Sequence, residues 1–376
     1  MRGSERLLGA IGSSHRFPEE TLPSQQDDTG RRSATMRDVA TMAGVGIATV
    51  SRVVNGKPVT PDLAERVTRA AEALGYRHDL TASSLRRADR RTSTLGLVLE
   101  DAANPFSAAL YRAVEDAAAE RGLLVLAGST DEDPARERGL LRTFTARRVD
   151  GLIVVPTGRN DADLDAARRA GTPVVCVDRR TAAPQVDTVT VDNRAGVRAA
   201  VKRLHEAGHR RIAFLGDLRS IWTADERHAG FVEGLAEVGC VRHPSLVRRG
   251  LHGAEAARAA TRELLALTHA PTAIVSGQNL LTLGARRTLQ DLRLQRRVAL
   301  IGFDDLPLAD LLEPGISVIA QDHAAIGREA AGLLFDRLAG EDGPARHRLL
   351  PTRYLARGSG ELPAPAPGPV PAREDR

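Results

Sequence analysis

From Leu95 onward, short apolar runs alternate with amphipathic segments of helical period, and this alternation constrains the fold most. Most of the runs lack polar alternation, as expected for strands covered on both faces. The rhythm therefore predicts parallel sheets with right-handed crossovers, an α/β fold. The expected strands are Leu95–Leu99, Leu123–Ala127, Gly151–Val155, Pro173–Val177, Thr188–Val191, Arg211–Leu215, Ala273–Val275, Val298–Gly302 and Ser317–Ile319. The expected helices include Phe106–Arg121, Pro134–Arg147, Arg194–Ala207, Ala224–Val238, Ala254–Leu267 and Asn279–Leu292.

The length of this alternating region indicates how many sheets it forms. Roughly 260 residues are long for one sheet, so two doubly wound subdomains are expected. A ligand would then bind in the cleft between them, at the carboxyl ends of the strands.

Composition excludes several classes of protein. The chain has 376 residues and only two cysteines, too few for a disulfide framework or a four-thiolate metal site. It has no apolar run near the ~20 residues needed to cross a bilayer, and its N-terminus lacks the apolar core of a secretion signal. We therefore expect a cytoplasmic protein with no membrane partner.

Positive charge is concentrated near the N-terminus. The formal net charge is +5, and the stretch from Arg37 to Arg91 holds ten basic and six acidic residues. A small basic head on a nearly neutral body is typical of a polyanion-binding module attached to another domain.

That head carries a helix-turn-helix pattern. Three short helical patterns lie between Met36 and Leu74, and Gly44 can take the positive φ of a tight turn after the first. The second helix would enter the major groove, with Asn55-Gly56 ending it. The outward residues, and our candidate DNA contacts, are Ile47, Ala48, Thr49, Ser51, Arg52 and Asn55. The alternative is a plain three-helix element that packs on the larger domain.

Catalytic motifs are absent from the sequence. It has no phosphate loop, no nucleophile elbow and no metal-like pair of histidines at helical spacing. The adjacent acids Asp304 and Asp305 should point in different directions, which argues against a shared-proton dyad. We expect no catalytic residue, no metal and no cofactor.

Several motifs, in order along the chain, resemble the signature of the LacI-type (lactose and purine repressor) regulators. Those in the head are Asp38-Val39-Ala40, Ala43-Gly44-Val45, Thr49-Val50-Ser51-Arg52-Val53 and Asn55-Gly56. Those that follow are Ala73-Leu74-Gly75-Tyr76, Ser84-Leu85-Arg86, Asn104-Pro105-Phe106, Val177-Asp178-Arg179, Val191-Asp192-Asn193, Gly208-His209-Arg210-Arg211-Ile212 and Ile301-Gly302-Phe303-Asp304-Asp305. The resemblance covers about 36–358. It implies a DNA-binding head, a hinge helix and a body of periplasmic-binding-protein type, acting as a homodimer on a pseudo-palindromic operator in double-stranded DNA.

The hinge, residues 79–87, is too short for a stable isolated helix, and a solvated linker is the simpler interpretation. The resemblance implies that paired hinge helices order on the operator. Ala82 would then allow close packing, Leu85 would wedge between base pairs in the minor groove, and Arg86 would hold a phosphate.

The resemblance also implies a set of ligand-binding residues in the cleft. These candidates are Phe106, Ser107, Asp178, Asp225, Arg227, Gln278, Asn279 and Asp304. Three features depart from the family pattern: Asp225 stands where many members have a ligand-binding Arg, Ser107 replaces a second Phe, and Gln278-Asn279 stands where the family has Asn-Asp. These departures argue against a purine or an anionic effector and favour a neutral sugar. In the head, Gly46 stands where the family usually has Ser, and the phosphate contact of that hydroxyl is lost.

These observations divide the chain into five segments. They are a disordered extension (1–35), a helix-turn-helix domain (36–78), a hinge (79–92), a ligand-binding and dimerisation domain (93–360) and a Pro-rich tail (361–376). The predicted function is sequence-specific transcription regulation, as a repressor whose operator binding is controlled allosterically by a small molecule, a sugar. Two alternatives remain at this point: a sugar-binding receptor with no DNA-binding role, and a nucleotide-dependent enzyme.

Overall fold

A computed structural model of the chain describes residues 34–54, 56–76 and 91–366. The chain divides into two compact units, a head within residues 1–83 and a body within residues 84–376. The predictions for residues 1–33, for Asn55 and for the hinge residues Ala82, Leu85 and Arg86 lie outside the described residues.

The head consists of three helices, as predicted: α1 (Met36–Ala43), α2 (Ile47–Val54) and α3 (Pro61–Ala73). Helix α1 begins with a capping box, in which Thr35 accepts from the amide of Asp38 at 3.3 Å and the Asp38 carboxylate accepts from the amide of Thr35 at 2.8 Å. Thr60 is the N-cap of α3, but its hydroxyl makes no capping hydrogen bond. The buried core of the head is Val39, Ala40, Ala43, Val50, Val67 and Ala70.

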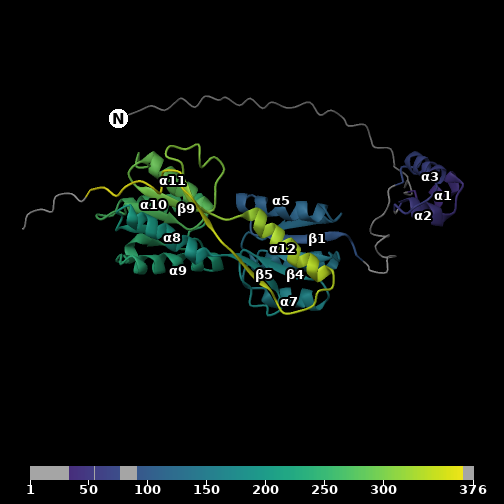
Figure 1. The fold of residues 1–376 in the computed structure, drawn as a ribbon, viewed down its shortest axis with the longest axis horizontal. Coiled ribbons are helices and arrows are strands. Elements are labelled where there is room, and N and C mark those ends of the chain that lie inside the picture. Colours follow the sequence, from purple (N-terminus) through teal and green to yellow (C-terminus); the bar gives the residue numbers. More distant parts are fainter. Residues whose placement is uncertain (1–33, 55, 77–90, 367–376) are drawn as a thin grey trace, which may run out of the picture. The chain divides into compact units, whose positions relative to one another are not determined.

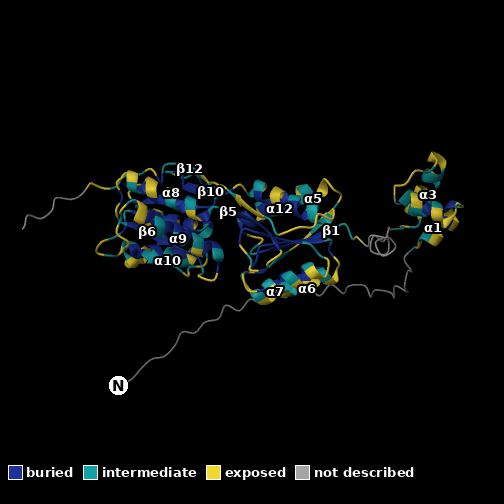
Figure 2. Ribbon diagram, turned by 60° about the horizontal axis from the view of Figure 1, so that its bottom comes forward, coloured by how far each residue is buried: buried dark blue, intermediate teal, exposed yellow. Residues whose placement is uncertain are grey.

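The body consists of two lobes, each built on a six-stranded sheet (Figures 1 and 2). In lobe 1 the strand order is β11-β5-β4-β3-β1-β2, and in lobe 2 it is β12-β10-β9-β8-β6-β7. The strands of lobe 1 are β1 (Thr94–Leu99), β2 (Leu124–Ser129), β3 (Gly151–Val154), β4 (Val174–Val177), β5 (Asp187–Val191) and β11 (His347–Leu350). Those of lobe 2 are β6 (Ile212–Leu215), β7 (Val247–Arg248), β8 (Ala273–Ser276), β9 (Ala299–Phe303), β10 (Ser317–Ala320) and β12 (Arg353–Leu355).

Helices cover both faces of each sheet, so most strands are buried while the outer helix faces are exposed (Figure 2). Lobe 1 carries α5 (Pro105–Ala119), α6 (Pro134–Ala146), α7 (Asp161–Arg169) and α12 (His323–Leu338). Lobe 2 carries α8 (Asn193–Glu206), α9 (Trp222–Glu237), α10 (Gly253–Leu265) and α11 (Asn279–Asp291), with a short 3₁₀ turn at Pro244–Leu246. Among the described residues, no helix is long and apolar enough to span a membrane.

The chain passes between the lobes three times: after β5, after β10 and after β11. Helix α12 therefore returns to pack on α5 and on the sheet of lobe 1 (Figure 1). The sequence analysis missed α7, α12 and the strands β7, β11 and β12. The sheets are parallel as predicted except for one pair, since β12 pairs antiparallel with β10.

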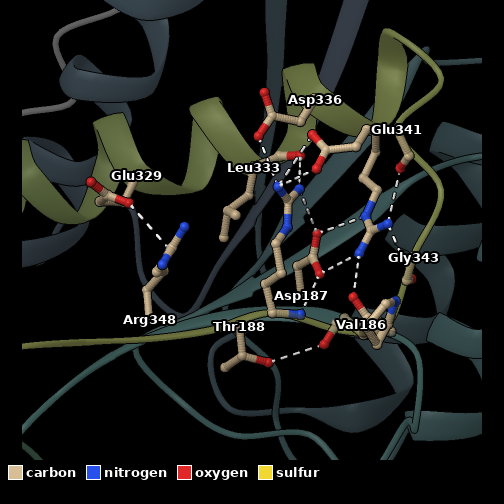
Figure 3. Close-up of polar contacts among 12 residues, drawn as sticks. Val186, Asp187, Thr188, Glu329, Leu333, Asp336, Glu341, Gly343 and Arg348 are labelled. Atoms are coloured by element: carbon tan, nitrogen blue, oxygen red, sulfur yellow. Dashed lines mark hydrogen bonds and ion pairs between the residues drawn. The ribbon is translucent and has the colours of Figure 1, made fainter.

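A buried carboxylate in lobe 1 binds the segment that returns from lobe 2, α12 and the residues before β11 (Figure 3). Asp187, at the start of β5, accepts two hydrogen bonds from the guanidinium of Arg337 on α12, at 2.8 and 2.9 Å. It also accepts from the backbone amide of Arg346, just before β11, at 2.7 Å. Burial opposes ionisation of Asp187, but these bonds outweigh it and lower its pKa.

The first part of the predicted tail belongs to lobe 2. The carbonyl of Leu362 lies 2.9 Å from Nε2 of the buried His209, and the amide of Ala364 donates to the carbonyl of Ala207 at 3.0 Å. Residues 361–364, predicted as the start of a separate Pro-rich tail, therefore belong with lobe 2. The apolar contact of Leu362 with the core of lobe 2 explains the difference.

Candidate DNA-binding and effector sites

The exposed face of α2 is the candidate DNA-binding surface. Ile47, Ala48 and Arg52 are exposed, whereas Thr49 and Ser51 are half-buried. A large apolar side chain such as Ile47, 45% exposed at the start of a recognition helix, can contact a thymine methyl group.

The turn before α2 sets the angle between α1 and α2. Gly44 has φ 62°, in the left-handed region, and the amide of Val45 donates to the carbonyl of Ala40 at 3.0 Å. The carbonyl of Gly46 accepts from the amides of Thr49 and Val50, so glycine serves as the start of α2 without a capping hydroxyl.

Arg66, a residue of α3 that was not among the predicted site residues, stabilises this turn through hydrogen bonds. Its Nη2 atom donates to the carbonyls of Ala43 and Gly44, at 2.7 and 3.1 Å. A Cβ added at Gly44 would lie 3.0 Å from the same nitrogen. Arg66 is therefore a positioning residue for the recognition helix.

Arg52 has a partner within the head. Its Nη2 atom donates to the carbonyl of Pro58 at 3.1 Å, across the loop that follows α2. To contact a base or a phosphate, the exposed side chain of Arg52 would have to break its hydrogen bond with the Pro58 carbonyl.

The body has a cavity of about 230 Å³ lined by residues from both lobes. Its lining from lobe 1 comprises Glu100, Asp101, Asn104, Phe106, Asp131, Glu132, Asp178 and Arg179. Its lining from lobe 2 and the β10–α12 crossing comprises Asp217, Ile221, Thr223, Ala224, Arg227, His252, Gly277, Gln278, Leu280, Asp304 and Gln321.

The structure brings five of the eight predicted ligand residues together in this lining. They are Phe106, Asp178, Arg227, Gln278 and Asp304. The other three do not line the cavity. Ser107 and Asn279 are buried beside it, whereas Asp225 is exposed and paired with Arg249.

The buried Asn279 has an identifiable structural role. Its amide nitrogen donates to Oδ1 of Asn104 at 2.7 Å, and the same oxygen caps α5 by accepting from the amide of Phe106 at 3.1 Å. Since Asn104 belongs to lobe 1 and Asn279 to lobe 2, this bond joins the two lobes beside the cavity.

Two carboxylates occupy equivalent positions in the two lobes. Asp178 follows β4 and Asp304 follows β9, and both have positive φ, at 65° and 68°. Their amides donate to the carbonyls of Val189 and Ile319, each at 2.9 Å. Asp305 points elsewhere, to Arg357, as expected for adjacent residues at a strand end.

Arg227 lines the cavity and is held by contacts within lobe 2. Its Nε atom donates to Oδ1 of Asn193 at 2.7 Å, and its Nη1 atom donates to the carbonyl of Gly277 at 2.9 Å. The guanidinium lies 3.8 Å from the ring centroid of Phe303 and 3.9 Å from a carboxylate oxygen of Asp304. Asn193, the Gly277 carbonyl and the Phe303 ring together fix the orientation of this guanidinium.

The pKa values of the two equivalent carboxyl groups, Asp178 and Asp304, are shifted in opposite directions. Burial raises the pKa of Asp178, although the charges of Arg227 and Arg179 oppose the shift. Burial also acts on Asp304, but the imidazole of His323, 4.0 Å away, and the charge of Arg227 outweigh it and lower its pKa. Asp304 is therefore the more firmly ionised of the two equivalent carboxylates.

The sequence analysis missed most of the polar lining, yet one signal could have found it. Eight of the missed residues follow the carboxyl ends of strands: Glu100 and Asp101 after β1, Asp131 and Glu132 after β2, Arg179 after β4, Asp217 after β6, His252 after β7 and Gln321 after β10. The rule that selected Asp178 and Asp304 would have selected these as well. Among the described residues, no group of three or more His, Cys, Asp or Glu side chains is placed to hold a metal ion.

Comparisons with known proteins agree with this geometry. The family model described as "Bacterial regulatory proteins, lacI family" matches residues 35–79, and that of the "Periplasmic binding protein-like domain" matches residues 201–360. The regulator CelR of Thermobifida fusca is 36% identical over 342 residues, covering 88% of this chain and 99% of CelR. The chain belongs to the LacI family.

Other LacI-family members extend the comparison. The repressor CytR of Escherichia coli K12 is 30% identical over 331 residues, covering 87% of this chain and 96% of CytR. The solved CelR–cellobiose complex has a TM-score of 0.65 and 33% identity, covering 87% of this chain and 99% of that one. The Lac repressor bound to ONPG in the repressed state has a TM-score of 0.77 and 25% identity, covering 87% and 100%.

These comparisons confirm the predicted family, the two-part architecture and the function of a DNA-binding transcription regulator. They decide against a receptor without a DNA-binding role, because the matching relatives are transcription regulators along nearly their whole length. The relatives are likewise regulators and not nucleotide-dependent enzymes.

Proposed function

We propose that this LacI-family regulator is a repressor that binds a pseudo-palindromic operator as a homodimer and is controlled by a neutral sugar in the cavity of the body. One observation carries the proposal: a head that exposes its recognition helix belongs to the same chain as a polar cavity between two lobes. Its action on operator DNA would place it in the cytoplasm.

On the DNA side, two half-sites would each receive one α2. Ile47, Ala48 and Thr49 lie at the N-terminal end of that helix, where base contacts are made in a helix-turn-helix. Ser51, Arg52 and Asn55 complete the proposed major-groove set, and Ala82, Leu85 and Arg86 the minor-groove set.

On the effector side, the charge of the cavity favours a neutral ligand. Its lining carries seven carboxyl groups and two guanidinium groups, so an anionic effector would be repelled. Carboxylates accept hydrogen bonds from hydroxyl groups, which a sugar supplies in number. The relative CelR is described in complex with cellobiose, a neutral sugar.

The contacts that join the lobes give the effector a way to act. Besides the bond between Asn104 and Asn279, the guanidinium of Arg180 in lobe 1 lies 5.6 Å from the ring of Trp222 in lobe 2. A ligand between the lobes shifts their arrangement only if it binds two arrangements unequally. We propose that the preferred arrangement changes the spacing of the two heads through the hinges.

Exposed apolar side chains on both lobes support the homodimer. Leu124 and Leu126 are exposed on the edge strand β2, and Leu308 and Leu311 are exposed in the loop after β9. Large exposed apolar side chains of this kind are characteristic of protein contact surfaces.

The experiment is operator selection with the purified chain, followed by measurement of affinity against salt and sugar. A regulator should protect a stretch with two-fold repeats, lose affinity steeply as salt rises, and respond to a neutral sugar. Protection of no genomic sequence would refute the DNA-binding part. Binding of nucleobases or sugar phosphates, with none of the neutral sugars, would refute the effector class.

A further inference from the structure

Glu100 lines the cavity directly after the end of β1. It follows β1, which pairs with β2 on one side and β3 on the other, and whose residues Leu95, Leu97 and Leu99 are buried. The carbonyl of Glu100 accepts from the amide of Asp131 at 2.7 Å. The backbone that carries this side chain is therefore firmly anchored.

The carboxyl group of Glu100 lacks a dedicated partner. Its Oε2 atom is buried and has no hydrogen-bond partner among the described residues. The nearby cation, Arg179, donates instead to both carboxylate oxygens of Glu132, at 2.6 and 2.8 Å. Asp178 shares this part of the cavity, and its buried Oδ1 atom also has no hydrogen-bond partner in the described structure.

This environment makes ionisation of Glu100 costly. Burial raises its pKa to about 7. The charge of Arg179 and the nearby hydroxyl of Ser107 only partly oppose this, while the charge of Asp178 adds to it. These groups come from the loop after β4 and from α5, and Asp101, Asp131 and Glu132 line the same cavity. Near neutral pH the side chain therefore exchanges between carboxylic acid and carboxylate.

We propose that Glu100 is a specificity-determining residue of the effector site, whose ionised carboxylate accepts a hydrogen bond from an effector hydroxyl at the β1 end of the cavity. The inference rests on the proposed function, because it needs a polyhydroxylated effector. In the ionised form both oxygens of Glu100 are available as acceptors, so effector affinity rises as pH increases through neutrality. Effector binding below pH 7 therefore releases a proton from Glu100.

The test is calorimetry on the full chain with three neutral sugars, glucose, ribose and cellobiose, from pH 5.5 to 8.5. For a group that titrates near 7, affinity should fall about 30-fold between pH 8.5 and 5.5. Glu100→Gln should bind at least tenfold more weakly at pH 8.5, because an amide oxygen is a weaker acceptor, and should lose most of this pH dependence. Glu120→Gln, the same change at an exposed residue after α5, should behave as the parent.

The outcomes separate this inference from the proposed function. If a sugar binds the parent and Glu100→Gln with the same affinity and pH dependence, the role of Glu100 is refuted and the proposed function stands. If none of the three sugars binds the parent, the effector class and this inference fail together. An affinity that falls as pH rises would mean that protonated Glu100 donates a hydrogen bond to the effector, and would also overturn the inference.

Melting curves without sugar test the unpaired carboxyl group directly. A raised pKa means that ionised Glu100 destabilises the fold above its ordinary value of 4.5. Glu100→Gln should therefore raise the melting temperature at pH 8.5 and leave it unchanged near pH 4. No gain at pH 8.5 would show that Glu100 is solvated or paired, and would refute the premise.

Discussion

Arg66→Ala should loosen the helix-turn-helix although Arg66 lies on α3, outside the recognition helix. The substitution removes two hydrogen bonds from a charged donor to the carbonyls of Ala43 and Gly44. Such bonds are individually worth about 1.5–3 kcal/mol, but one nitrogen makes both and the side chain is 41% exposed, so roughly 2 kcal/mol in total is expected. A head with six buried core residues has little stability to lose.

Hydrogen–deuterium exchange of the full-length protein measures this loss locally. A loss of roughly 2 kcal/mol corresponds to about 30-fold faster exchange in peptides covering α1 and α2, provided that these amides exchange through opening of the head. Peptides of the body should be unaffected.

Arg69→Ala is the matched control. Arg69 lies on the same helix and pairs with Glu65 at 3.4 Å, just as Arg66 pairs with Asp62 at 3.8 Å, both at i,i+4 spacing. Each variant loses one charge and one surface pair worth a few tenths of a kcal/mol, so the difference isolates the carbonyl bonds. Equal exchange in the two variants would refute the positioning role of Arg66.

Three further predictions concern the body and the hinge. Asp187→Ala should lower the free energy of unfolding of lobe 1 by about 3 kcal/mol at pH 7 in urea titrations, because Arg337 and Arg346 lose a buried partner. The pKa of Asp187 is lowered in the folded protein, so ionised Asp187 stabilises the fold fully at pH values above its ordinary pKa of 3.8. This stabilisation should vanish as the pH falls through the lowered pKa. A variant as stable as the parent at pH 7 would contradict this prediction. Emission from Trp222, the one tryptophan in the sequence, should change when a sugar binds, because the charge of Arg180 lies close to its ring; unchanged emission at saturation would argue against relative motion of the lobes there. Leu85→Ala should weaken operator binding at least tenfold without changing the slope of affinity against salt, whereas Arg86→Ala should reduce that slope by about one; parental affinity in Leu85→Ala would exclude the minor-groove wedge.

The fold was largely predictable because each buried strand leaves a local signal. The nine expected strands correspond to β1–β6 and β8–β10, which are continuous apolar or nearly apolar runs. The missed strands lack that signal. β7 has two residues, and β11 reads His-Arg-Leu-Leu at an exposed sheet edge. Which sheet a strand joins is a long-range property, so the exchange of the C-terminal strands between the lobes could not be read locally.

The candidate effector site was predictable by position but not by side-chain direction. Asp178 and Asp304 line the cavity because strand ends converge there. Asn279 also follows a strand, yet it turns to Asn104, 175 residues away in the sequence. Asp225 was expected at the site from its place in the family pattern, but it is exposed and pairs with Arg249 instead. Pairings between distant residues decide such cases, and no local pattern encodes them.

The return of the chain across both lobes has a consequence for the gene. One short stretch, residues 347–355, supplies the closing edge strand of both sheets. A nonsense codon upstream of His347 would thus leave both sheets with an open, aggregation-prone border, although most of each lobe would already have been translated. Neither lobe is encoded as one continuous segment. Recombination between related genes could therefore transfer the two lobes only together, with residues 347–355 included.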